Sequence, residues 1–355
     1  MQGIGRLSVM GGLDNKWALE EHFSTGENNK YWNSAAESAR NGKALTEYVE
    51  SSLLDVDERL RLMDKTGIER SIVSLTSPGI QSITDIATAI RLARETNDLV
   101  RGQYMDKHPH RLSMFACIAT QDPGEAAAEL DRAVRDLGAV GVLVNGYTNV
   151  GDAQTARYLD HPTFAPLWAK IAELRVPLYL HPREPLPSQT LIYDGYPALV
   201  GSAWGFGHET ATHAVRLMLS GIFDQYPGIQ VILGHLGEGL PFLLPRLEHR
   251  LDKQREGVGL GNARRTVSQY FSDNFYVTTS GHFHTRALFN AIANWVWTAS
   301  CSPPTTPTKP WKKPAPGSTP LCSATTTRSR SAGRMLDGFS RPRSDSLQSL
   351  CRMCC

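Results

Sequence analysis

Short, mostly apolar segments alternate with amphipathic segments between residues 17 and 295 of this 355-residue chain. Most of the apolar segments are nearly continuous, as parallel strands buried on both faces are. The alternation predicts seven strands, over 17–23, 71–75, 112–119, 139–145, 176–181, 230–235 and 275–279, with helices between them. This pattern predicts an α/β fold, and we expect a (β/α)₈ barrel of the TIM type. An open doubly wound sheet is the alternative, but it lacks a convincing glycine fingerprint here.

A barrel of this type needs an eighth strand after Trp295, and the sequence there does not supply one. Ser302–Pro307 reads SPPTTP, and proline cannot donate the hydrogen bond that a central strand needs. The segment 296–355 holds eight of the 21 prolines and no Ile, Tyr or Glu. We therefore expect a disordered leader over 1–16, a barrel over 17–295 whose eighth strand is missing or replaced, and a disordered Pro/Ser/Thr-rich tail over 296–355.

The net charge of +2 is unevenly distributed along the chain. The tail has nine Lys and Arg against two Asp, which leaves 28 basic and 33 acidic residues in the body. The tail has neither interleaved aromatic residues nor a fold, so we expect no nucleic-acid partner. Five of the six cysteines lie in the tail and Cys117 stands alone, which predicts no disulfide framework. No signal peptide or membrane-spanning run is visible, so a cytoplasmic protein without a membrane partner is expected.

Polar residues at the ends of predicted strands are the candidates for chemistry in a barrel. Glu20 and His22 are two residues apart on the first strand and would project from the same face. On their own they fit half of a divalent-metal site and a solvated turn equally well. His181 ends the fifth strand and favours the metal site. His235 ends the sixth strand as a ligand or an acid/base, and Glu238 could orient it.

Other residues near the predicted strand ends carry weaker signals. Arg246, on an apolar helix, is either a surface ion-pair partner or a residue that supports the substrate site. His282 follows the seventh strand and is expected to line the entrance of the barrel. Phe23, Trp204 and Phe206 could form the wall of an aromatic binding site, and as large apolar residues they could equally belong to the core.

Several motifs in order along residues 16–294 carry a family resemblance. They are ALEEHF at 18–23, YLHPR at 179–183, IYDG at 192–195, ETATHA at 209–214, LGHLGEGLP at 233–241 and TTSG at 278–281. Together they resemble the metal-dependent benzoate decarboxylases of the amidohydrolase superfamily, most of all the γ-resorcylate (2,6-dihydroxybenzoate) decarboxylases. The resemblance implies an amidohydrolase-type barrel with one Zn²⁺ or Mn²⁺ ion, a small aromatic carboxylate as substrate, and a homodimer or homotetramer.

The resemblance also assigns roles to residues of this chain. It implies that Glu20, His22 and His181 bind the metal, that His235 and Glu238 act near the substrate, and that Arg246 supports the site. The family's fourth ligand, an aspartate on the eighth strand, has no counterpart here. We therefore expect an unclosed barrel that retains metal poorly and has little activity. Alternatives are a metal-dependent hydrolase of the same superfamily, which a His-X-His first strand would have favoured, or a non-catalytic truncated product.

The genetic code offers an explanation for the missing strand. When codons are read from the third base of each original codon, the Trp297–Thr298 junction must encode Asp and the Trp311–Lys312 junction must encode Glu. With these two residues, the other junctions from Val296–Trp297 to Lys312–Lys313 permit Val-Asp-Arg-Ile-Leu-Phe-Ser-Thr-Asp-Tyr-Pro-Tyr-Glu-Thr-Met-Glu-Glu, which resembles the eighth strand of the family with its aspartate. We hypothesise a shift of reading frame near Trp295.

Overall fold

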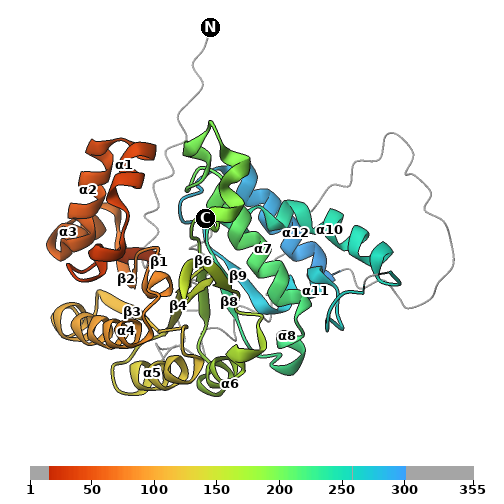
Figure 1. The fold of residues 1–355 in the computed structure, drawn as a ribbon, viewed down its shortest axis with the longest axis horizontal. Coiled ribbons are helices and arrows are strands. Elements are labelled where there is room, and N and C mark those ends of the chain that lie inside the picture. The colour runs from red at the N-terminus through yellow and green to blue at the C-terminus, as the bar shows by residue number, and fades with distance from the viewer. Residues whose placement is uncertain (1–15, 258, 301–355) are drawn as a thin grey trace, which may run out of the picture.

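Seven parallel strands form one continuous sheet in this computed structural model, which describes residues 16–257 and 259–300. The order β1-β2-β3-β4-β7-β8-β9 follows the chain, and the sheet curls into part of a barrel with helices outside it (Figure 1). The strands are β1 Lys16–Phe23, β2 Ile68–Leu75, β3 Leu112–Ala116, β4 Gly141–Asn145, β7 Leu178–His181, β8 Val231–Leu233 and β9 Phe275–Val277. The seven predicted strands are confirmed. The doubly wound alternative is wrong, because the strand order never reverses.

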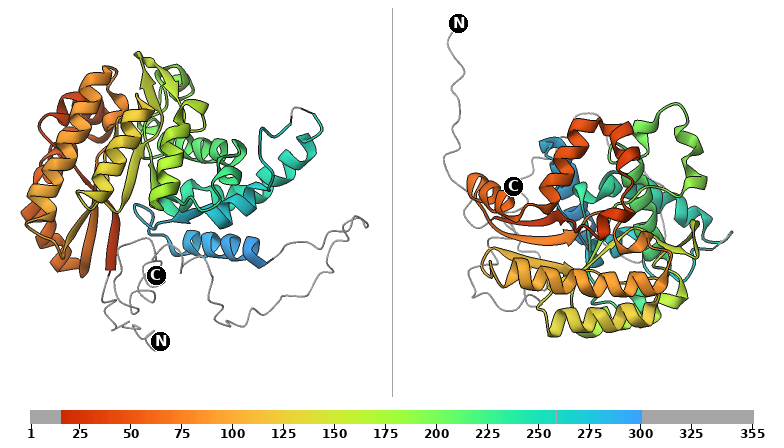
Figure 2. Two further views of the ribbon diagram at one scale, coloured as in Figure 1. Left: turned by 90° about the horizontal axis from the view of Figure 1, so that it is seen from below. Right: turned by 60° about the vertical axis from the view of Figure 1, so that its left-hand side comes forward.

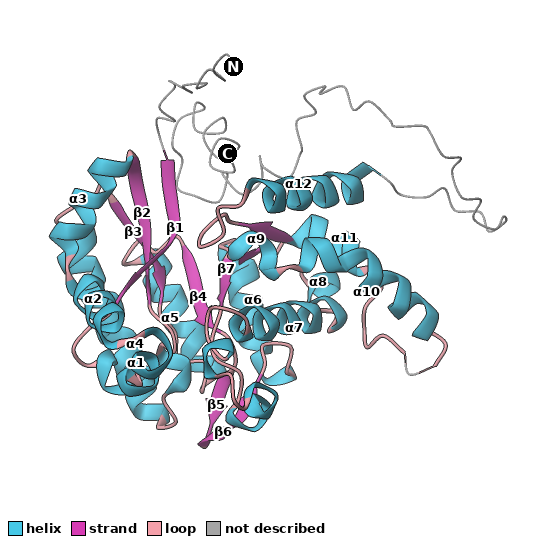
Figure 3. Cartoon of the chain, turned by 90° about the horizontal axis from the view of Figure 1, so that it is seen from above, coloured by secondary structure: helices cyan, strands magenta, loops and turns pink. Residues whose placement is uncertain are grey.

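Helices connect the strands and cover the outer face of the sheet. Figure 2 shows α4 (Ile86–Val100) and α5 (Pro123–Arg135) side by side along that face. Figure 3 shows α10 (Leu240–Gln254), α11 (Val267–Asn274) and α12 (Thr285–Ser300) packed together at the other end of the sheet. The other α-helices are α1 Ser34–Asn41, α2 Lys43–Leu54, α3 Val56–Thr66, α6 Ala165–Leu174, α7 Gly205–Leu219, α8 Ile222–Gln225 and α9 His235–Glu238. No described helix is long and apolar enough to cross a membrane.

Short elements complete the connections. The 3₁₀-helices are η1 Asn28–Tyr31, η2 Ile80–Ser82, η4 Pro162–Phe164, η5 Pro187–Tyr193 and η6 Pro197–Leu199, and η3 Arg101–Met105 is a π-helix. β5 (Thr148–Val150) and β6 (Asp152–Arg157) form a separate antiparallel hairpin after β4.

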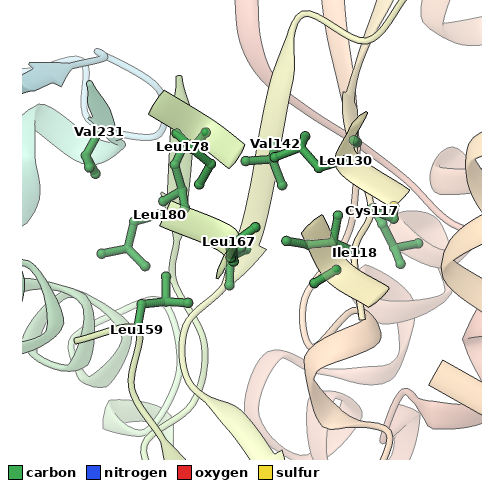
Figure 4. Packing of buried hydrophobic residues seen from close by; sticks show 14 of the residues in the cluster. Cys117, Ile118, Leu130, Val142, Leu159, Leu167, Leu178, Leu180 and Val231 are labelled. Carbon is green, nitrogen blue, oxygen red and sulfur yellow. The ribbon is translucent and has the colours of Figure 1, made fainter. Parts of the chain in front are cut away.

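Side chains alternate between the two faces of each strand, and this alternation makes two cores. Val142 of β4 and Leu178 and Leu180 of β7 face outward and pack in the larger cluster with residues of the surrounding helices (Figure 4). The inner face carries a small cluster made of Ile72, Phe115, Leu143, Tyr179 and Ile232. A polar residue two positions beyond an inner apolar residue therefore also lies on the inner face, at the carboxyl end of its strand.

Some connections contain structure that the sequence did not predict. The segment Ser24–Ser52, between β1 and α3, contains α1 and most of α2, and Asn33 caps α1 by accepting a hydrogen bond from the backbone N–H of Ala36. The β5–β6 hairpin was not predicted, because its strands are short and β6 is largely exposed. α11 was not predicted either, although Val267, Tyr270 and Phe271 have helical spacing and a capping box begins the helix. Asp122 caps α5 by accepting hydrogen bonds from the backbone N–H groups of Gly124 and Glu125.

The predicted segment boundaries shift slightly at both ends of the barrel. Lys16, placed in the leader by the sequence, belongs to β1, and residues 296–300, placed in the tail, continue α12. The rest of the predicted leader and tail, 1–15 and 301–355, lies outside the described residues. Within the described part of the chain, β1 pairs only with β2 and β9 only with β8, so these two strands are the edges of the sheet.

Candidate metal centre and active site

Glu20, His22 and His181 come together at the carboxyl ends of β1 and β7. One ligand atom from each lies within 4.8 Å of the others. Glu20 Oε1 is 3.3 Å from His181 Nε2 and 4.0 Å from His22 Nε2. The Glu20 and His181 side chains are nearly buried, whereas that of His22 is 20% exposed. The structure thus brings together the three residues that were predicted from the sequence as metal ligands.

This set of atoms fits one divalent ion. A carboxylate oxygen and two imidazole nitrogens form a common ligand set of catalytic zinc, and ligand distances of about 2.0–2.2 Å place neighbouring ligand atoms about 3.3 Å apart around a tetrahedral ion. Carboxylate and imidazole ligands also suit manganese. Burial lowers the pKa of His22 to about 3, so its ring is neutral at pH 7 and offers a lone pair.

Glu20 uses its two carboxylate oxygens differently. Oε2 accepts hydrogen bonds from the hydroxyl groups of Tyr179 on β7 and Ser280 after β9. Oε1 remains free to face the histidine nitrogens. Burial raises the pKa of Glu20, but the close contact with His181 and the charges of the surrounding histidines outweigh burial, and the pKa is lowered well below its usual value. Glu20 is therefore a carboxylate with one oxygen anchored and the other directed at the site.

His235 and Glu238 form a second unit on the loop that follows β8. His235 Nδ1 is 2.7 Å from Glu238 Oε1, and His235 Nε2 is 3.3 Å from Glu20 Oε1. The pair depends on an unusual backbone, because His235, Leu236 and Glu238 all have positive φ angles. Burial lowers the pKa of His235, but Glu238 and Glu20 outweigh it and raise the pKa to about 9. His235 is thus protonated at neutral pH, beside the three-residue cluster.

One cavity of ≈ 1180 Å³ opens over these residues. Most of the predicted site residues line it, together with residues from α1, the loop after β7 and α10. The lining includes Glu20, His22, His181, His235, Glu238, His282, Trp204, Phe206, Tyr147, Arg183, Phe242 and Leu243. The cavity is large enough for an aromatic acid, since ligand pockets of roughly 300–1,000 Å³ are typical.

Two of the predicted substrate-binding residues lie elsewhere. Phe23 is 1% exposed and belongs to the outer core, where its ring packs 5.5 Å from that of Tyr104. It follows His22 directly, and successive side chains of a strand point to opposite faces, so it cannot share the inner face. Arg246 is exposed on α10 and does not line the cavity. The substrate-binding prediction for these two residues is therefore not supported by their positions.

Sequence reasoning missed the residues that hold the ligands in place. Ser74 Oγ lies 3.0 Å from His22 Nδ1, and Asn145 Oδ1 lies 2.7 Å from His181 Nδ1. Tyr179 and Ser280 were not singled out either. Ser74, Asn145 and Tyr179 carry only one signal, a place on the inner face, which can be identified once strand alternation and register are known. Ser280 lies in the turn after β9, where strand alternation gives no signal.

Comparison with known proteins now gives this arrangement a class. A family model described as amidohydrolase matches residues 51–304. The chain belongs to the amidohydrolase family.

The particular relatives are decarboxylases. The chain is 44% identical over 293 residues to a γ-resorcylate decarboxylase of Rhizobium sp. strain MTP-10005, covering 79% of this chain and 84% of the relative. It is 46% identical over 290 residues to that of Polaromonas sp. strain JS666, with the same coverage. A structure of 2,6-dihydroxybenzoate decarboxylase with 2,6-dihydroxybenzoate has a TM-score of 0.74 at 44% identity and covers 79% of this chain and 85% of that one. A structure of dihydroxybenzoic acid decarboxylase from Polaromonas sp. strain JS666, with bound manganese and the inhibitor 2-nitroresorcinol, also has a TM-score of 0.74 at 44% identity. The match covers 79% of this chain and 83% of that one.

Proposed function

We propose that this barrel is built for the nonoxidative, metal-dependent decarboxylation of an ortho-hydroxybenzoate, with 2,6-dihydroxybenzoate as the first substrate to test. The proposal rests on one observation: two groups of residues line the same cavity. Glu20, His22 and His181 form the first, and the His235–Glu238 pair lies beside them. Relatives with 43–46% identity are γ-resorcylate decarboxylases, which supports this substrate class.

The three clustered residues would hold one Zn²⁺ or Mn²⁺ ion through Glu20 Oε1, His22 Nε2 and His181 Nε2. When bound, such an ion supplies a Lewis acid for the carboxylate and phenolate oxygens of the substrate. Glu20 can serve as a ligand without moving, because Tyr179 and Ser280 already fix its other oxygen.

The reaction also needs a proton at the ring carbon that carries the carboxylate. That carbon gains a proton, its bond to the carboxylate breaks, the electron pair returns to the ring and CO₂ leaves. We assign the proton to His235 Nε2, which borders the cluster. Glu238 binds the other ring nitrogen, so it orients the ring and favours its protonated form.

The cavity wall supplies the remaining contacts. Trp204 and Phe206 line the cavity and offer apolar surface for a benzene ring. His282 also lines the cavity, and we assign it a contact with the substrate. Phe23 and Arg246 have no part in this proposal, because neither lines the cavity.

The test compares two chains: the 355-residue protein and a version in which the shifted reading frame after Trp295 is restored. We expect the restored version, loaded with Mn²⁺, to release CO₂ from 2,6-dihydroxybenzoate, and the 355-residue protein to be at least a hundredfold slower. This difference follows from the unpaired edges of β1 and β9 and from the aspartate that the restored frame would supply. A His181→Gln substitution in the restored version is the control and should abolish activity.

Two outcomes would contradict these proposals. A restored version that binds Mn²⁺ but releases no CO₂ from any of a panel of hydroxybenzoates would refute the proposed reaction. Equal activity of the two chains would refute the predicted need for the eighth strand and its aspartate, and would leave the proposed reaction standing.

A further inference from the structure

The structure assigns Asn145 as a positioning residue that fixes the ring tautomer of His181, so that the Nε2 lone pair faces the metal site. This inference rests on the proposed metal site and goes beyond it by naming the group that prepares one ligand. Asn145 is the last residue of β4, and its neighbour across the sheet is His181, the last residue of β7. Asn145 is 2% exposed and His181 is 6% exposed. The contact between them is therefore built into the register of two buried strands.

The direction of the hydrogen bond follows from the other partners of Asn145. Its amide nitrogen, Nδ2, donates to the carbonyl oxygen of Leu75 at 3.3 Å. That leaves Oδ1, an acceptor only, facing His181 Nδ1 at 2.7 Å. His181 Nδ1 must then carry the proton, and in a neutral ring the lone pair must lie on Nε2. Nε2 is the atom that approaches Glu20 Oε1 at 3.3 Å.

A reversed amide would place Oδ1 against the carbonyl oxygen of Leu75, and the neighbours of Asn145 hold the residue in place. Its backbone N–H donates to Gln81 Oε1 at 3.2 Å, and Gln81 Nε2 donates to the carbonyl oxygen of Ile118 at 3.0 Å. On another side, a Cβ at Gly79 would lie 2.3 Å from Asn145 Nδ2, and Gly79 has a φ angle of +61°. Only glycine suits that position, and its backbone packs directly against the amide.

His22, the other histidine of the cluster, has no neighbour that fixes its ring tautomer in this way. Ser74 Oγ, 3.0 Å from His22 Nδ1, belongs to a hydroxyl group that can donate or accept. It therefore does not specify which nitrogen of His22 carries the proton. Asn145 differs because its amide nitrogen is directed at the Leu75 carbonyl, which leaves an oxygen that can only accept facing His181.

The first experiment reads the tautomer in the unmodified 355-residue protein. The metal-free chain is labelled with [¹⁵N]histidine, and ring ¹⁵N–¹H correlations are recorded at alkaline pH, where each ring keeps one proton. The His181 signals are assigned by their loss in His181→Gln. We expect the remaining proton on Nδ1, since the 2.7 Å contact to Asn145 is shorter than the 3.3 Å contact between Nε2 and Glu20. A proton on Nε2 would overturn the inference.

The second experiment measures metal affinity with Co²⁺, followed by visible absorption and by calorimetry. Asn145→Leu removes the acceptor with little change of volume and should weaken Co²⁺ binding about 10- to 100-fold, the range typical of such partners. Asn145→Asp keeps an acceptor and should restore most of the affinity. Asn97→Leu is the matched control, because Asn97 is also a buried asparagine bonded to the backbone but lies at Cys117, in the outer core.

The outcomes separate this inference from the proposed function. If the parent chain binds no Co²⁺ in a His181-dependent way, Glu20, His22 and His181 do not suffice to hold a metal in this chain, and the tautomer measurement still decides the role of Asn145. If the parent binds Co²⁺ and Asn145→Leu binds it within twofold, the assigned role is refuted. A loss shared equally by Asn145→Leu and Asn97→Leu would indicate a general effect on folding and also count against it.

Discussion

His213 should govern part of the acid sensitivity of this protein, although it takes no part in the proposed chemistry. The sequence places it among apolar residues of a helix and favours a structural role. The structure agrees: His213 is fully buried on α7, and its Nε2 accepts the backbone N–H of Leu159 at 3.0 Å. Its Nδ1 has no hydrogen-bond partner among the described residues. Burial, aided by the charge of Arg216, lowers the pKa of His213 to about 3.

The sign of the pH effect follows from this lowered pKa. An unfolded histidine has a pKa of about 6.5, so between pH 6.5 and about 3 the unfolded chain binds a proton that the folded chain refuses. Stability is therefore retained above pH 6.5 and lost as the pH falls through this window. From the two pKa values, the loss between pH 7 and pH 5 is about 2 kcal/mol of unfolding free energy.

The assay is urea unfolding at pH 7 and pH 5 for the parent and for His213→Gln. Glutamine keeps an acceptor for the Leu159 N–H and cannot gain a proton, so the variant should lose about 2 kcal/mol less than the parent over this interval. His161→Gln, at an exposed residue, controls for the removal of a histidine as such. Parallel losses in the parent and His213→Gln, within about 0.5 kcal/mol, would refute the reasoning.

Three substitutions at the active site should separate metal binding from proton transfer. Gly281→Ala places a Cβ 2.7 Å from His235 Cδ2, so we expect at least a tenfold loss of kcat in the restored version with Mn²⁺ affinity nearly unchanged, measured by turnover and calorimetry. Gly234→Ala places a Cβ 2.6 Å from Glu20 Oε2, so it should weaken Mn²⁺ binding at least tenfold in the same titration; unchanged affinity would count against the anchored carboxylate. Glu238→Gln removes the main group that holds the pKa of His235 at about 9, so a pH–rate profile should show the alkaline limb moving to lower pH.

The sequence predicted the strands and the candidate ligands because both depend on local patterns. Apolar runs specify buried parallel strands, and the two-residue spacing of Glu20 and His22 places them together wherever that strand lies. The same rule, applied to Phe23, would have placed it on the outer face. Phe23 was assigned to the substrate site because it is aromatic, and the alternation of side chains along the strand was not taken into account.

The residues that sequence reasoning missed depend on distant parts of the chain. Tyr179 meets Glu20 across 159 positions, and Ser280 meets it across 260. Asn145 acquires its role only through the pairing of β4 with β7. No local pattern in a single sequence contains these distances, so strand register had to be known first. α1 and α2 were missed for a different reason: α1 buries no residue, and α2 has no side-chain cap and buries only Thr46 and Leu53.

Glu20 links the two open edges of the sheet at the end where the site lies. β1 is an edge strand, and backbone hydrogen bonds join it only to β2. The Glu20 carboxylate nevertheless binds Tyr179 on β7 and Ser280 beyond β9, so side chains connect β1 to the far side of the curled sheet. An ion held by Glu20, His22 and His181 would join the same two strands again, β1 and β7. The residues that would bind metal are thus also the ones that hold the described barrel together where its backbone pairing is incomplete, and metal binding should be coupled to the closure of the fold.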